Sequence, residues 1–218
     1  KLGDTENRLI PKTFFWMFLG LLGSALVAGY TYYSGLLEEI LYGDFFNILL
    51  ILELVVVILF SWLFKKLSPT VVAILYFVYA ALNGVTLSCI FAVFELSSIG
   101  LLFVAAALAF GGLAFYGYKT QDDLSSWHKP LFAILIVGLI VSIINIFMGN
   151  TTLDIILDWV ILFVFFGITI YDMNKIKALA DSPDLPIDKL HIYGAMELYL
   201  DFINIFLRIL SLFGKRRS

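Results

Sequence analysis

Seven long apolar stretches, separated by short polar clusters, restrict what this chain can fold into. They lie near residues 14–33, 45–64, 71–94, 99–118, 131–148, 155–175 and 192–213. Most have the roughly 17 to 25 residues that an α-helix needs to cross the hydrocarbon core of a membrane. The sequence lacks the ten-residue alternation of apolar and polar residues that is typical of transmembrane β-barrels. We therefore expect an all-α integral membrane protein with seven transmembrane helices in one domain over residues 1–218.

The composition is typical of a membrane protein, and the sequence motifs give little support for an enzyme. Hydrophobic residues make up 61% of the chain, charged residues only 14%, and the mean hydropathy is +0.99. No nucleophile and base occur at a recognisable spacing, and His128 and His191 lie in or beside loops. No phosphate loop, dinucleotide fingerprint or nucleic-acid motif is visible. We expect no catalytic residues, no cofactor and no nucleic-acid partner.

The basic residues predict the orientation of the chain in the membrane. If the stretches cross, ten basic residues lie in the polar segments on one side: Lys1, Arg8, Lys12, Lys65, Lys66, Lys119, Lys129, Lys175, Lys177 and Lys189. The loops on the other side carry acids instead: Glu38, Glu39, Asp44, Glu95, Asp154 and Asp158. Because lysine and arginine are enriched in cytoplasmic loops, we expect a cytoplasmic N-terminus.

The basic tail does not follow this pattern. Seven crossings place Lys215, Arg216 and Arg217 on the outer, acidic side. Either the tail tolerates that position, or the last stretch enters the membrane and returns on the same side. Both alternatives put the last stretch inside a bundle, because irregular backbone at membrane depth has to be shielded by other helices.

Asp201, in the run LYLDFIN, is the carboxylate that lies deepest in the last stretch. A charge at that depth costs several kcal/mol on insertion scales, so it is expected to face a protein interior or a water path. Glu197, Asp201, Asn204 and Arg208 are spaced by four, three and four residues and form one helical stripe. The stripe either lines a polar pathway or forms a structural network in which Arg208 reaches Asp201 through Asn204.

Asp172, in the run ITIYDMNKIK, is a second acid in the cytoplasmic half. It lies about 5 to 8 Å inside its helix end, and Asp201 lies about 15 Å along the next helix. Consecutive antiparallel helices can bring the two carboxylates together. Such a pair shares a proton, titrates as a coupled unit and acts as a proton switch. Its hard oxygen ligands suit Ca²⁺, although two carboxylates alone make a weak site.

Glu53 is the remaining deep acid, near the middle of the second stretch. An isolated glutamate at that depth is expected to be protonated or to have a partner. Two roles are open. Glu53 can face a lumen and take part in cation passage, or it can be structural and hydrogen-bond to Asn83, Asn145 or a backbone carbonyl.

The runs YDMNKI and LYLDFINIF resemble the paired signatures of the transmembrane Bax-inhibitor-motif family. The likeness covers most of the chain. Among the members of this family, the chain is similar to the small bacterial ones. It implies two layers of three helices around a central C-terminal helix, in the plasma membrane of a bacterium. It also implies a pH-dependent calcium leak channel gated by a di-aspartyl pH sensor, which falls here on Asp172 and Asp201. The expected partners are the lipid bilayer, protons and Ca²⁺ as the transported ion.

The resemblance further implies a basic latch residue at the end of the second helix. That position holds Phe64, so Lys65 or Lys66 is expected to act as the latch. Two other functions are open. The chain can be a non-transporting adaptor that regulates another membrane protein, such as a quality-control protease, or it can be a proton-coupled cation exchanger.

Overall fold

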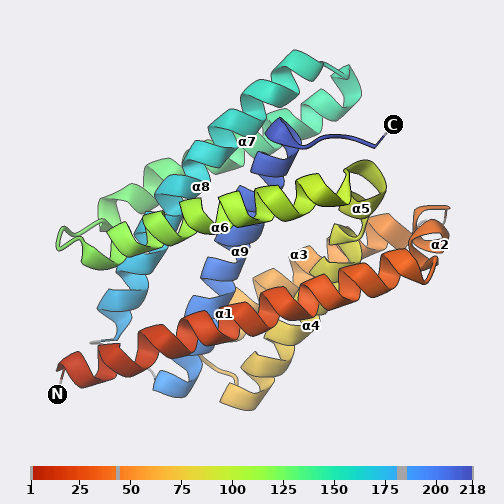
Figure 1. The fold of residues 1–218 in the computed structure, drawn as a ribbon. Coiled ribbons are helices and arrows are strands. Elements are labelled where there is room, and N and C mark those ends of the chain that lie inside the picture. The colour runs from red at the N-terminus through yellow and green to blue at the C-terminus, as the bar shows by residue number, and fades with distance from the viewer. Residues whose placement is uncertain (1, 43–44, 181–185, 218) are drawn as a thin grey trace. The chain divides into compact units, whose positions relative to one another are not determined.

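The computed structural model describes residues 2–42, 45–180 and 186–217, and every regular element within this part is a helix. Figure 1 shows the arrangement of the elements, which are α1 (Leu2–Tyr33), α2 (Leu36–Tyr42), α3 (Phe45–Leu63), α4 (Pro69–Leu87), α5 (Cys89–Val93), α6 (Leu96–Lys119), the 3₁₀ turn η1 (Ser125–Trp127), α7 (His128–Met148), α8 (Thr151–Leu179) and α9 (Ile187–Phe213). The predicted all-α architecture is confirmed. Lys1 and Asp44 of the charge pattern lie outside the described residues.

Five helical segments of the described chain are long and apolar enough to cross a membrane. They are Arg8–Tyr33, Pro69–Val93, Leu96–Lys119, Ser125–Met148 and Thr151–Leu179. The second predicted stretch is a shorter apolar helix, Ile48–Leu63, and the seventh is α9, which carries the polar stripe. The count of seven crossings is therefore not confirmed by length and composition, and it stays a prediction.

The third predicted stretch, 71–94, is divided into two helices at Ser88. The Ser88 hydroxyl donates to the Val85 carbonyl oxygen at 2.5 Å, and the Thr86 hydroxyl contacts the Leu82 carbonyl oxygen at 3.2 Å. Hydroxyl groups that bond back to the preceding turn compete with the helix ladder and bend it. This local competition explains why α4 ends at Leu87 and α5 begins at Cys89.

The described chain divides into two compact units. The first unit is drawn from residues 1–95, 180–199 and 216–218. Within it α1 packs along α4, and α4 also packs against α3 (Figure 1). At Gly84 of α4 a Cβ atom would lie 2.6 Å from the Ser24 carbonyl oxygen of α1. A small residue at this crossing lets the two backbones approach closely, as is common between helices in membranes.

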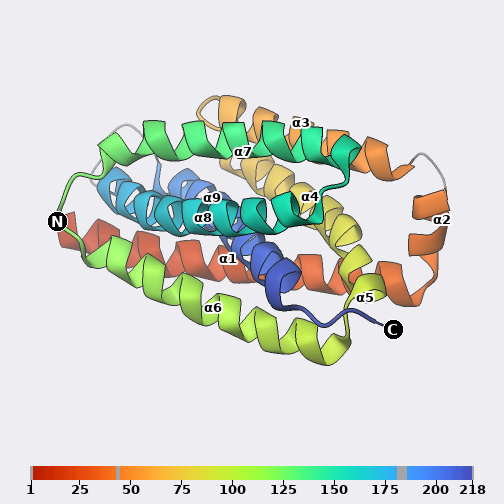
Figure 2. The same cartoon turned by 90° about the horizontal axis from the view of Figure 1, so that it is seen from above.

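The second unit comprises residues 96–179 and 200–215. Helix α8 packs against both α6 and α7, so it forms the middle of the unit (Figure 2). The crossing of α6 and α8 also depends on a glycine, because a Cβ atom on Gly117 would collide with the backbone carbonyl of Ile170.

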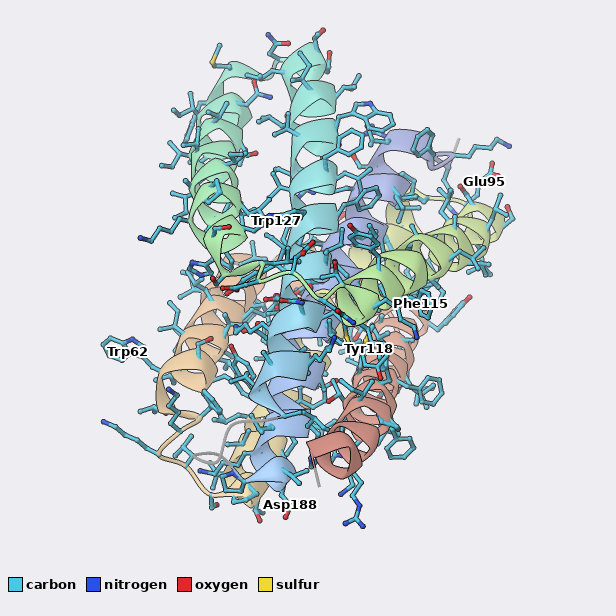
Figure 3. All side chains as sticks on the ribbon, turned by 90° about the vertical axis from the view of Figure 1, so that its left-hand side faces the viewer. Trp62, Glu95, Phe115, Tyr118, Trp127 and Asp188 are labelled. Atoms are coloured by element: carbon cyan, nitrogen blue, oxygen red, sulfur yellow. The ribbon has the colours of Figure 1, made fainter. Side chains whose placement is uncertain are left out.

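In the first unit, the start of α9 lies beside the first half of α1 and the end of α3. Asp188 lies 4.0 Å from the Lys12 ammonium group, and the Lys189 ammonium group donates to the Lys65 carbonyl oxygen at 3.2 Å. Figure 3 shows Asp188 at the start of α9 and Trp62 projecting outward from α3. The Trp62 side chain is exposed. The basic residues Lys12, Lys65 and Lys189 therefore gather at one end of the unit, as the charge pattern predicts.

The basic tail lies at the other end of the same unit. The Arg217 backbone N–H donates to the Val93 carbonyl oxygen at 2.9 Å, and its guanidinium donates to the Tyr32 hydroxyl near the end of α1. Helix α9 is continuous from Ile187 to Phe213. It thus carries the chain from the basic end of the first unit to the opposite end. A continuous helix does not fit the alternative in which the last stretch turns back within the membrane. That α9 crosses the membrane stays a prediction.

His191, just before the predicted span 192–213, makes stability depend on pH. Burial, followed by the nearby Lys12, lowers the pKa of His191 below its ordinary value, although the Ile187 carbonyl and Asp188 oppose this shift. The fold therefore favours the neutral ring, so stability is complete above about pH 6.5 and falls as the pH drops through that value. In thermal unfolding of solubilised protein, His191→Gln should lose part of this dependence, whereas His128→Gln should keep it. An unchanged slope in His191→Gln would contradict the assignment.

Candidate functional site

The two aspartates predicted to form the pH sensor are both buried in the second unit. Asp172 on α8 is 4% exposed and Asp201 on α9 is 2% exposed. Each takes part in at least one hydrogen-bonding or electrostatic interaction. Neither carboxylate is therefore placed against lipid, as expected for acids within apolar helices. That they share a proton stays a prediction.

Aromatic packing positions the helix turn that carries Asp201. The neighbouring Phe202 ring lies 5.1 Å from the Phe103 ring and 5.7 Å from the Phe110 ring, both on α6. These contacts are edge-to-face, which is a favourable geometry for aromatic pairs. They fix the rotation of α9 in this unit, so they also fix the direction in which Asp201 leaves the helix.

The polar stripe of α9 does not form the predicted chain from Arg208 through Asn204 to Asp201. The Asn204 amide donates to the Leu200 carbonyl oxygen of its own helix at 2.8 Å. The Arg208 guanidinium instead donates to Asp158 on α8 at 2.6 Å. The prediction of this network is wrong because α8 offers Arg208 a buried carboxylate, and charge-assisted hydrogen bonds are the stronger ones.

Asp158 is the functional candidate that the sequence reasoning missed, since it was expected in an acidic outer loop. The structure places it inside α8, 7% exposed. Its second carboxylate oxygen accepts a hydrogen bond from the Ser211 hydroxyl at 2.5 Å. The sequence contains a signal for this helix start in the pair Gly149 and Asn150. In the structure Gly149 ends α7 with a φ of 63°, and the Asn150 side chain caps the first turn of α8.

Glu53 belongs to a hydrogen-bonded network in the first unit. It accepts from the Thr86 hydroxyl and from the Asn83 amide, the latter at 3.4 Å. The Tyr199 hydroxyl of α9 donates to the side-chain amide oxygen of Asn83 (Oδ1) at 2.9 Å and lies 2.6 Å from the Ser24 hydroxyl of α1. The structural alternative with Asn83 as partner is thus present. A role of Glu53 in cation passage stays a prediction.

The network predicts a measurable cost when the Tyr199 hydroxyl is removed. Tyr199→Phe leaves the buried side-chain amide oxygen of Asn83 without its donor. An unsatisfied buried polar group costs about 1–3 kcal/mol. We expect a lower melting temperature in detergent for this variant. Tyr30→Phe is the matched control, because Tyr30 is exposed on the same unit. Equal melting temperatures for the two variants would exclude a stabilising role of the network.

The remaining predicted residues lie as follows. Glu197 is half-buried on α9 in the first unit and has an interaction partner. Lys65 and Lys66 are exposed just after α3, whereas Phe64 at the predicted latch position is buried and stacks on Tyr193 of α9 with ring centres 4.5 Å apart. An apolar contact thus occupies the latch position. A latch role for either lysine stays a prediction.

The described side chains offer little for tight metal binding. Within the residues that the structure covers, no group of three histidine, cysteine, aspartate or glutamate side chains converges. Since Ca²⁺ takes six to eight oxygen ligands in stable sites, any contact at Asp172 and Asp201 needs additional ligands such as water.

The apolar helices and their buried acids define an all-helical integral membrane protein. A family model described as inhibitor of apoptosis-promoting Bax1 matches residues 6–218, and the chain belongs to this family. The chain is 39% identical to the inner membrane protein YbhL of Escherichia coli K12 over 214 residues. The aligned region covers 95% of this chain and 92% of YbhL. The chain is 32% identical to an uncharacterized protein of Borreliella burgdorferi, over 98% of this chain and 94% of the relative. The resemblance found in the sequence is thereby confirmed.

Proposed function

We propose that this protein is a pH-sensitive calcium leak channel in which Asp172 and Asp201 share a proton. The observation that carries the proposal is the burial of both carboxylates in consecutive helices of the same unit. Two acids in such a site cannot both ionise cheaply if they are close, so proton uptake and release changes their mutual interaction. Family membership supports the same function.

The proposal includes seven crossings, with the layers of three helices arranged around α9. Its support is that most described side chains of α9 are buried, while the helix is about 40 Å long at 1.5 Å per residue and exceeds the hydrocarbon thickness of about 30 Å. The proposal also places the basic end of each unit, and hence the N-terminus, in the cytoplasm of a bacterium. In the second unit, Lys177 reaches the carbonyl oxygens of Tyr118 and Thr120 at that end.

Purified protein in liposomes loaded with a Ca²⁺ indicator tests the function. A leak channel admits Ca²⁺ down its gradient at a rate that changes with pH when the pH is equal on both sides. A proton-coupled exchanger conducts at fixed pH only when a proton gradient is imposed. No flux above that of empty liposomes at any pH would reject both transport functions and favour the non-transporting adaptor.

A further inference from the structure

The second unit contains an ion pair that the proposed proton switch does not use, formed by the buried Asp158 and the half-buried Arg208. Asp158 Oδ1 accepts a hydrogen bond from Arg208 Nη1 at 2.6 Å, and Asp158 Oδ2 accepts one from the Ser211 hydroxyl at 2.5 Å. The Arg208 Nε atom is buried without a hydrogen-bond partner. The guanidinium is thus held mainly by this single carboxylate.

The pair lies well inside the helices. Asp158 lies seven residues, or about 10 Å, from the start of α8, and Arg208 lies five residues, or about 8 Å, from the end of α9. Arg208 also follows Asp201 by seven residues, or about 10 Å along α9. Arg208 lies toward the tail from Asp201, on the same stripe of α9. A cation that moves along this stripe beyond Asp201 therefore meets the Arg208 charge next.

Stability alone is a weak reason to keep such a pair. Desolvation of two charges offsets much of their attraction, and apolar replacements of buried ion pairs are often neutral or stabilising. Intramembrane charges usually mark ion pathways, and a fixed guanidinium is an effective barrier to cations. The oxygen atoms of Asp158 and Ser211 are also of the kind that hard cations prefer.

We propose that Asp158 and Ser211 form a second cation-binding position, and that the Arg208 guanidinium occupies it and closes the pathway as an electrostatic gate. A divalent cation enters only by displacing the guanidinium from the carboxylate. This inference rests on the proposed leak function for its role in flux, but the binding position is testable without flux.

Two readouts on purified protein test the gate. Arg208→Gln should raise Ca²⁺ flux into liposomes about tenfold at fixed pH, which corresponds to about 1.4 kcal/mol of barrier. In detergent, added Ca²⁺ should raise the melting temperature of the same variant. Added Na⁺ at equal ionic strength should not raise it. The wild type should show no such increase, because its own guanidinium fills the position. Arg208→Lys, which keeps the positive charge, should behave as the wild type does in both measurements.

Replacement of Arg208 alone leaves the charge of Asp158 buried without its partner, which can prevent folding. The second variant therefore neutralises both members of the ion pair. Asp158→Asn combined with Arg208→Gln removes the barrier and the ligand together. It should conduct above the wild-type rate without stabilisation by Ca²⁺. Wild-type flux in the double variant, or equal behaviour of Arg208→Lys and Arg208→Gln, would overturn the gate. Absence of wild-type flux combined with Ca²⁺-dependent stabilisation of Arg208→Gln would reject the leak but retain the binding position.

Discussion

Replacement of either Asp201 or Asp172 by asparagine should abolish the pH dependence of Ca²⁺ flux. Asparagine has the shape of a protonated aspartate but cannot release a proton, so each single variant removes the switch. In the wild type we expect flux to differ about tenfold or more between the two protonation states, since 1.4 kcal/mol of differential stability shifts a two-state equilibrium tenfold. In each variant the flux should be nearly constant across the same pH series.

The control for this experiment is an acid of the same unit that lies outside the apolar helices. Asp122 is exposed in the loop between α6 and η1, and Asp122→Asn should leave both flux and its pH dependence unchanged. If Asp172→Asn and Asp201→Asn each retain the wild-type profile, the aspartates are not the pH sensor.

Gly117→Ala is expected to have the largest effect on packing. The added Cβ atom would collide with the Ile170 backbone, which cannot rotate away as a side chain can. The helices α6 and α8 must separate, and overpacking of this kind costs about 1–3 kcal/mol. Because Ile170 precedes Asp172 by two residues, the displacement should also change the Ca²⁺ flux. Thermal unfolding in detergent and flux in liposomes measure the two effects.

Gly112 on the same helix provides the matched control. A Cβ atom there would have no neighbour within 4 Å. Gly112→Ala should therefore keep the wild-type melting temperature or raise it slightly, because alanine is the better helix former. Equal melting temperatures for the alanine variants at 117 and 112 would show that the close crossing at Ile170 is not needed for stability.

The helices were predictable because long apolar runs leave the backbone few alternatives in a membrane. The stretch 45–64 corresponds to Phe45–Leu63, and 131–148 ends at Met148 as predicted. The burial of Asp201 followed from the cost of a charge in hydrocarbon. In each of these cases a property of the local sequence, its length or its charge, was sufficient.

The side-chain partners were not predictable to the same degree. The Arg208 interaction joins residues 50 positions apart, and it depends on the rotation of two helices that are apolar on most faces. A uniform apolar surface does not reveal which face meets which neighbour. The break at Ser88 was missed for another reason, because hydroxyl groups bond to the preceding turn without interrupting the apolar run.

The most direct test of the central claim is a titration of the individual carboxyl groups by infrared difference spectroscopy on isotopically labelled protein. We expect the two carboxyl groups to be coupled, so that in the wild type Asp172 and Asp201 titrate in two linked steps. In Asp172→Asn the remaining Asp201 then titrates at a pH that matches neither step. If Asp201 titrates at the same pH in Asp172→Asn and in the wild type, the two aspartates are independent and the shared-proton switch is contradicted.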